Sequence, residues 1–229
     1  HLYSLMQLAT HCDFNNDDFK NLLETKNTPT LFEYWAFFVV KKILDKTNNA
    51  QSYRTVVSSN PLEQTITPEI CIAYEGGITL WFNKTYRGTS GRQPGDSFAV
   101  SDELKGSYSH KLIPDIVIER NNKLLIFDAK FKGQRDGFYG ENEDGSIGSW
   151  KPEDIDKMHC YREAIKAVTG AYILYPGESA VVYSAHNATG MYEGVGALPL
   201  KPEAGARPVQ RHLENIERII REFIKGALS

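Results

Sequence analysis

Cysteine is scarce in this chain of 229 residues, and the three that occur, Cys12, Cys71 and Cys160, lie far apart. An odd number of cysteines at such spacing forms neither a disulfide framework nor a zinc-binding pattern, so we expect a reducing compartment and a cytoplasmic protein. No apolar run is long enough to span a bilayer, and no secretory signal precedes the first helix-like segment. We therefore expect no membrane partner.

Several function-bearing patterns are missing as well. The formal charge of −3 gives no overall basic character, so a nucleic-acid partner would need a local positive groove. No phosphate-binding P-loop, no dinucleotide-binding glycine fingerprint and no His-based zinc motif occurs in a suitable context. No repeat of 20 to 50 residues is present, which excludes a solenoid.

The length suits one large mixed domain, which can bury a full core without disulfides. Residues 1–27 have helical spacing but weak caps, and we interpret them as a helical lead-in to a domain that covers residues 28–229. The chain starts at His1 and enters a helix-like segment at once, so we expect the lead-in to be the end of a truncated N-terminal region.

A strongly apolar helix is predicted from Thr28 to about residue 46, with Thr28 as its N-cap and Pro29 in the first helical position. Its polar sector is narrow and is formed by Tyr34, Lys41, Lys42 and Asp45. Glu33 falls on the buried side of this helix. Since a buried carboxylate is rarely left unpaired, Glu33 either forms a salt bridge or loop hydrogen bond, or serves a site.

The chain is organised around residues 112–131, which read as two apolar strands joined by a turn at residues 121–122. Asp115 lies in the first strand, and Asp128 and Lys130 lie near the end of the second. Antiparallel pairing about the turn places Asp115 close to Asp128, and residues two apart share a face of a strand. Because ionisable groups are costly inside apolar strands, this convergence indicates a site.

Two aspartates and a lysine in one small volume are suited to metal-dependent cleavage of a phosphodiester. Carboxylates and a backbone carbonyl, here that of Ala129, are ligands that Mg²⁺ prefers. Lys130 would orient the nucleophile or stabilise charge on the phosphate, and Glu33 would supply a further carboxylate to a second metal or through water. The alternative is that Asp115 caps a bend and Asp128 pairs with Lys130 on a solvated face.

The remaining elements are expected around this hairpin. A polar segment at residues 86–97 is interpreted as a loop whose Arg87 and Arg92 either contact phosphates or remain solvated. A closing helix is predicted at residues 209–227. Further strands are expected at residues 54–59, 76–86, 97–103, 171–177, 180–186 and 196–200.

A helix is also predicted at residues 152–169, with Gly170 as its terminator. Lys157 and Tyr161 are four residues apart on one margin of its apolar stripe, so they are neighbours. Either they bind substrate, or Tyr161 belongs to the core and Lys157 extends its charge outward. His159 points away from the stripe and is expected at the surface.

Pro114-Asp115, a short pair of apolar strands and Asp128-Ala129-Lys130 together resemble the motif of the PD-(D/E)XK nuclease superfamily. The resemblance implies an α/β, restriction-endonuclease-like fold, in which a mixed central β-sheet is flanked by helices. It implies a nuclease that uses Mg²⁺, with Mn²⁺ as a possible substitute. Related RecB-like nucleases carry Gln and Tyr at the spacing of Lys157 and Tyr161, and the lysine in place of Gln suggests a phosphate contact.

A narrower resemblance covers most of the chain from about residue 28. The segments LFEYWAFF, PDIVIE, FDAKFK, DIDKMHCYREAI, YILYPG and GVGALPLKP are similar to nuclease domains of McrC-type proteins of modification-dependent restriction systems. This resemblance implies a DNA endonuclease in phage defence that works with an McrB-like AAA+ GTPase motor subunit. A homodimer is possible for double-strand cleavage. The alternatives are a nuclease for RNA or structured DNA, and a docking module that is inactive without its motor.

Overall fold

The structure is a computed structural model that describes the chain in six parts. The backbone is described for residues 28–60, 65–86, 107, 111–131, 150–203 and 207–227, and side chains are described for these except 28, 53–60 and 65–68. The expected lead-in at residues 1–27, the expected strand at 97–103, and Arg87 and Arg92 lie outside the described residues. The predictions for them stay predictions.

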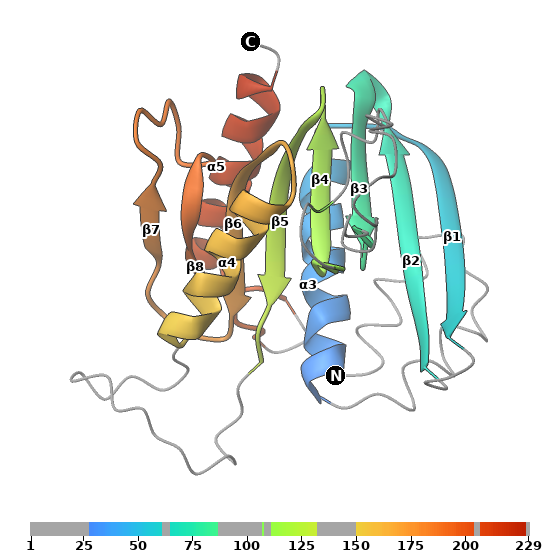
Figure 1. The fold of residues 1–229 in the computed structure, drawn as a ribbon, viewed down its shortest axis with the longest axis horizontal. Coiled ribbons are helices and arrows are strands. Elements are labelled where there is room, and N and C mark those ends of the chain that lie inside the picture. The colour runs from blue at the N-terminus through green and yellow to red at the C-terminus, as the bar shows by residue number, and fades with distance from the viewer. Residues whose placement is uncertain are drawn as a thin grey trace, which may run out of the picture.

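One eight-stranded sheet forms the centre of the molecule, in the order β1-β2-β3-β4-β5-β6-β8-β7 (Figure 1). Neighbouring strands from β1 to β5 are antiparallel, β5, β6 and β8 are parallel, and β7 returns antiparallel at the edge. The strands are β1 Ala50–Asn60, β2 Thr65–Tyr74, β3 Ile78–Phe82, β4 Ile116–Arg120, β5 Lys123–Ala129, β6 Val168–Tyr175, β7 Val181–Ser184 and β8 Gly194–Pro199.

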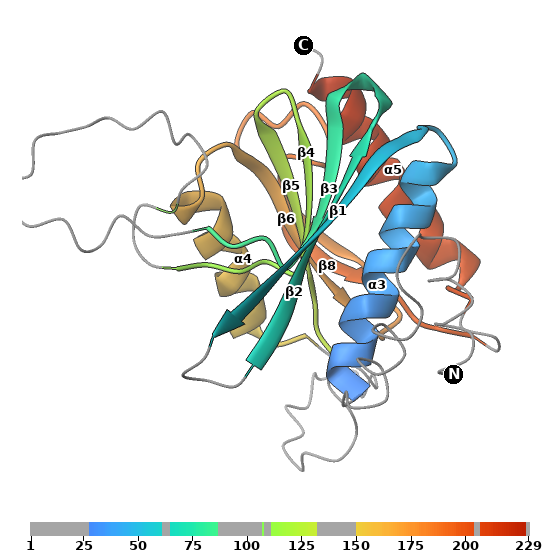
Figure 2. The same ribbon diagram turned by 90° about the vertical axis from the view of Figure 1, so that its right-hand side faces the viewer.

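Helices cover both faces of this sheet. Figure 2 shows α4 (Pro152–Ala164) on one face, and α3 (Thr28–Asp45) and α5 (Gln210–Gly226) on the other. A mixed sheet between helices is the expected restriction-endonuclease-like α/β architecture, and the prediction of the fold class is confirmed. No helix in the described ranges combines the length and the apolar character that crossing a membrane requires.

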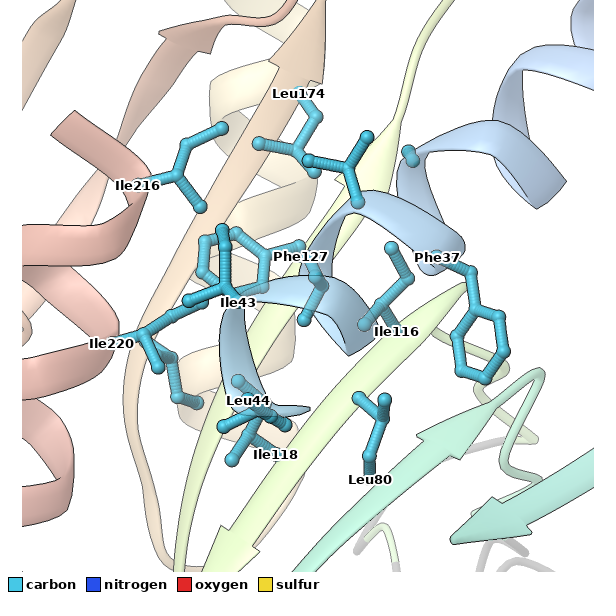
Figure 3. Packing of buried hydrophobic residues seen from close by; sticks show 14 of the residues in the cluster. Phe37, Ile43, Leu44, Leu80, Ile116, Ile118, Phe127, Leu174, Ile216 and Ile220 are labelled. Atoms are coloured by element: carbon cyan, nitrogen blue, oxygen red, sulfur yellow. The ribbon is translucent and has the colours of Figure 1, made fainter. Parts of the chain in front are cut away.

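The core has two parts, one on each side of the sheet. The larger joins α3 and α5 to one face through residues such as Phe37, Phe127 and Ile220 (Figure 3). The smaller joins α4 to the other face through residues such as Ile126 and Met158. Fully burying one such side chain contributes roughly 1.5–3 kcal/mol. Since side chains alternate along β5, the position after Phe127 faces α4.

The predicted helix from Thr28 is present and is packed on most of its circumference, but two members of its predicted polar sector are buried. Tyr34 is 2% exposed, and its ring lies 4.8 Å from that of Phe82 in β3. Lys41 is 5% exposed and pairs with Asp45 at 2.6 Å. The predicted polar sector was wrong here because the antiparallel half of the sheet, including β3, extends over that side of α3.

The central hairpin and its turn are confirmed, but its strands are shorter than predicted: β4 starts one residue after Asp115, and β5 ends one residue before Lys130. Asn121 and Asn122 have φ values of 47° and 61°, the left-handed geometry of a two-residue hairpin turn. Ile116 of β4 pairs with Phe127 of β5. Continuing this register by one residue sets Asp115 beside the next residue of β5, which is Asp128.

The helix predicted at residues 152–169 was wrong at its end. It stops at Ala164, and Gly170 lies in β6. The chain turns through Ala167, which has a φ of 68°, before the strand starts. Gly170 is required by a close approach instead: a Cβ atom there would lie 2.1 Å from the Tyr192 carbonyl oxygen. β2 was not predicted, whereas the expected strands that became β6, β7 and β8 and the closing helix are present.

Candidate active site at the end of β5

Asp128 is the most deeply buried charged side chain of the site, with an exposed fraction of 0%. It lies near the end of β5, at the end of the sheet near which α3 and α4 also begin (Figure 1). Three donors face its carboxylate. Lys157 Nζ lies 3.0 Å from Oδ1, the Tyr161 hydroxyl donates to Oδ1 at 3.1 Å, and Lys130 Nζ forms an ion pair with Oδ2.

Asp115 is held beside Asp128 by backbone contacts. Its Oδ2 accepts a hydrogen bond of 2.7 Å from the backbone N–H of Ala129. Its own carbonyl accepts a hydrogen bond of 2.8 Å from the N–H of Asn83, which follows β3 with a φ of 54°. The aspartate just before β4 is thereby tied to the strands on either side of it, so the position of its carboxyl group is set by the sheet.

The electrostatics of Asp115 reflect a crowded acidic position. Burial, then the charge of Asp128 and then that of Glu33 raise the pKa of Asp115 well above its ordinary value. The Lys130 ammonium group and the Ala129 N–H lower this pKa, but they only partly offset the other effects. A carboxyl group whose ionisation is disfavoured by a second carboxylate beside it is stabilised by a cation between the two.

The neighbouring donors stay protonated. Burial lowers the pKa of Lys130, but the charge and hydrogen bonding of Asp128, with Asp115, outweigh it and raise this pKa above its usual value. Burial and the charge of Asp128 also raise the pKa of Tyr161. Lys130 is therefore a fixed ammonium cation, and Tyr161 is a fixed O–H donor, at physiological pH.

The ligands present fit a hard divalent cation. Asp128 Oδ2 is buried, and among the described residues the ammonium group of Lys130 is the cation that compensates its charge. The N–H of Ala129 points toward Asp115, and an extended residue directs its N–H and C=O to the same neighbour, so the Ala129 carbonyl faces Asp115 too. Two carboxylates and a carbonyl are the oxygen donors that Mg²⁺ prefers.

Glu33 contributes charge to this site from α3. It is partly buried and close enough to raise the pKa values of Asp115 and Tyr34. Among the residues that the structure describes, however, no three His, Cys, Asp or Glu side chains form a group that could hold a metal ion. The described residues therefore do not place Glu33 together with both aspartates as direct ligands of one ion.

Most of the predicted site residues are brought together. Asp115, Asp128 and Lys130 converge as the hairpin register requires, and Lys157 and Tyr161 join them from α4 through direct contacts with Asp128. His159 is exposed, as expected. The catalytic and binding roles assigned to these residues stay predictions.

One supporting residue was missed. Asn83 fixes the backbone of Asp115 from the strand next to β4. The only signal in the sequence is an Asn directly after an apolar strand, since Asn tolerates left-handed backbone geometry better than most residues. The pairing of β3 with β4, which gives Asn83 its role, cannot be read from that signal.

Comparison with known proteins identifies a family. The model of the PD-(D/E)XK nuclease superfamily matches residues 30–180, which is more than half of the chain and includes every residue described at the site. No curated protein and no solved structure matches the chain.

Proposed function

Since the chain belongs to the PD-(D/E)XK nuclease superfamily, we propose that it is a Mg²⁺-dependent endonuclease that hydrolyses phosphodiester bonds of DNA. The observation that carries this proposal is the burial of Asp128 beside Asp115, with Lys130 paired to it. A fully buried carboxylate next to a second, partly buried one is costly in a purely structural role. It is suited to binding a cation that acts on an anionic substrate.

Asp115, Asp128 and the Ala129 carbonyl would hold Mg²⁺, with Mn²⁺ as a possible substitute. The ion would lower the pKa of a bound water and polarise a phosphate oxygen. The hydrogen bond from the Ala129 N–H keeps Asp115 Oδ2 in place, and the Tyr161 hydroxyl does the same for Asp128 Oδ1. The protein thus orients both carboxylates before any ligand binds.

Lys130 would stabilise charge on the phosphate and orient the attacking water. Its raised pKa keeps it an ammonium group, so it acts as a charge and a donor rather than as a base. A preorganised donor of this kind contributes on the order of 10²–10³ in rate. Glu33 would act on the site through water, which agrees with its electrostatic influence on Asp115.

The direct experiment compares the wild-type protein with Asp128→Asn on supercoiled plasmid DNA in the presence of Mg²⁺. Asn keeps the shape and one acceptor oxygen but removes the charge, so we expect cleavage to fall by about 10³-fold or more. Circular dichroism establishes that the variant is folded. A purified, folded Asp128→Asn variant that still nicks DNA at the wild-type rate would contradict the proposal.

DNA is proposed as the substrate, with RNA and structured nucleic acids as the alternatives. The same core chemistry attacks any phosphodiester, so the substrate has to be assigned by assay. Parallel reactions on plasmid DNA, single-stranded DNA and RNA, each with Mg²⁺ and with Mn²⁺, separate these candidates. Cleavage of RNA alone would replace DNA in the proposal and leave the metal site unaffected.

We further propose a place in a restriction or phage-defence system of the McrC type, with an McrB-like AAA+ GTPase as partner and a homodimer for double-strand cuts. The six segments that resemble McrC-type nuclease domains support this. GTP-dependent stimulation of cleavage by such a motor is the expected result. A domain that folds and binds metal, yet never cuts any nucleic acid even with the motor, would favour a docking role.

A further inference from the structure

We propose that Lys157 is an exchangeable counterion of Asp128. Lys157 forms an ion pair with the Asp128 carboxylate when no metal is bound, and it is released when a divalent cation binds. This inference rests on the proposed function, because it concerns the same metal site. It assigns to α4 a control on metal affinity, in addition to a phosphate contact.

The contacts of Asp128 provide the first support. Its carboxylate is fully buried and is bracketed by two ammonium groups, Lys130 on Oδ2 and Lys157 on Oδ1, the latter at 3.0 Å. The Tyr161 hydroxyl shares Oδ1 at 3.1 Å. A buried carboxylate needs such compensation, and here protein cations supply it without any metal.

Charge balance gives the second step. Asp115, Asp128 and the more distant Glu33 oppose Lys130 and Lys157, so the five groups carry a net charge of −1 when all are ionised. A divalent cation added to this set leaves one excess positive charge, and the departure of one ammonium group removes that excess. Since like charges repel strongly at short range, metal binding and release of one lysine are coupled.

Exposure identifies which lysine leaves. The side chain of Lys157 is 41% exposed, whereas that of Lys130 is 26% exposed. Lys157 reaches Asp128 from α4, and its ammonium group also lies 5.2 Å from the centre of the Tyr161 ring. Lys157 can therefore turn into water at little cost, whereas Lys130, which follows β5 directly and is less exposed, has less freedom.

Release also has a consequence for substrate. A displaced Lys157 is still anchored on α4 beside the site, but it has lost its carboxylate partner. An anionic phosphodiester is the group that restores its compensation. Binding of the metal thus makes the Lys157 ammonium group available to the substrate. The metal ion and the phosphodiester are therefore expected to bind cooperatively, through this one side chain.

The test is a calorimetric titration of the protein with MnCl₂. Lys157→Met removes the charge and keeps the length, and we expect it to tighten Mn²⁺ binding about fivefold, the scale of a partly exposed ion pair. Lys157→Arg keeps the charge and should bind as the wild type does. Lys166→Met removes the same charge from an exposed position after α4 and is the matched control.

Thermal melts distinguish this role from a merely structural one. Lys157→Met should lower the melting temperature in EDTA, where Asp128 loses a counterion, and should show a larger rise on addition of Mn²⁺ than the wild type. If Lys157 had only a structural role, Lys157→Met would lower the melting temperature in EDTA and the melting temperature with Mn²⁺ equally. That outcome, or unchanged or weaker Mn²⁺ binding by Lys157→Met, overturns the inference.

Asp128→Asn separates this inference from the proposed function. If Asp128→Asn abolishes Mn²⁺ binding while Lys157→Met binds as the wild type does, the metal site stands and the counterion exchange fails. If the wild type and Asp128→Asn bind Mn²⁺ alike, or neither binds, the proposed metal site itself fails.

Discussion

At the scale of single residues, the site depends on how two adjacent carboxyl groups are compensated. Asp128 has two ammonium groups and a phenol around it, whereas Asp115 has a backbone N–H and a more distant influence from Lys130. The result is an asymmetric pair. Asp128 is held by side chains that can be replaced one at a time, and Asp115 is held by the sheet.

Asp115→Asn is expected to stabilise the metal-free protein at neutral pH by about 1 kcal/mol, as often happens when a strained functional residue is replaced. The pKa of Asp115 is raised in the folded state, so the native aspartate loses stability as the pH rises from its ordinary value of 3.8 through the folded value. The advantage of Asn should therefore vanish below that window. Urea unfolding across pH in EDTA measures it, and an advantage that is greatest in acid would contradict this assignment.

Tyr161→Phe should destabilise the metal-free protein by roughly 1.5–3 kcal/mol, because a hydrogen bond to a buried charged group is lost. Tyr86→Phe is the matched control. The Tyr86 hydroxyl is also buried, and none of the described residues forms a hydrogen bond with it, so its removal should be neutral or slightly stabilising. Equal losses for the two variants in urea unfolding would show that the contact with Asp128 is unimportant.

At the scale of elements, the β4–β5 hairpin serves two ends of the molecule. At one end it carries the two aspartates. At the other end its turn caps α5, because Arg120, Asn121 and Lys123 donate to the carbonyls of Ile224, Ala227 and Gly226 at 2.8, 2.8 and 2.9 Å. These are carbonyls that the end of a helix leaves without helical partners, and cationic donors also favour the helix dipole there.

Arg120→Met should therefore loosen the end of α5 and cost about 2 kcal/mol, since Arg120 is 9% exposed and its hydrogen bond to Ile224 is charge-assisted. Hydrogen exchange should rise in the last turns of α5. Arg221→Met, at an exposed position of the same helix, is the control and should change neither. Unchanged exchange at the end of α5 in Arg120→Met would contradict this capping role.

The elements that could be predicted are those whose evidence is local. The Asn121-Asn122 turn fixes the hairpin register, and with it the meeting of Asp115 and Asp128. The end of α4 could not be predicted, because the apolar stripe continues through Ile165 and Val168 although Val168 already belongs to β6. Periodicity over a few apolar residues does not distinguish a buried strand from the last turn of a helix.

At the scale of the whole molecule, the site lies where the sheet changes its pairing. β5 is antiparallel to β4 on one side and parallel to β6 on the other. Asp115 comes from the antiparallel half, and α4, which carries Lys157 and Tyr161, connects β5 to β6. The contact of Tyr161 with Asp128 depends on this crossover, which no short stretch of sequence specifies, so only the spacing of Lys157 and Tyr161 could be predicted.

The packing of α3 against the sheet should contribute strongly to the stability of the protein. Phe37 of α3 is fully buried, with its ring 5.1 Å from that of Phe82 in β3. Phe37→Ala should cost about 3–5 kcal/mol through lost burial and a cavity. Lys42→Ala, at an exposed position of α3, should change stability by less than about 0.5 kcal/mol. A small loss in Phe37→Ala, measured by urea unfolding, would contradict the packing described for α3.

The proposed chemistry requires that Asp115, Asp128 and the Ala129 carbonyl share one divalent ion. Anomalous diffraction from a crystal of the wild-type protein soaked in MnCl₂ tests it most directly. We expect an anomalous peak between the two carboxylates and that carbonyl, with the Lys157 side chain turned away from Asp128. The absence of a peak there, at a manganese concentration that supports cleavage of nucleic acid, would contradict it.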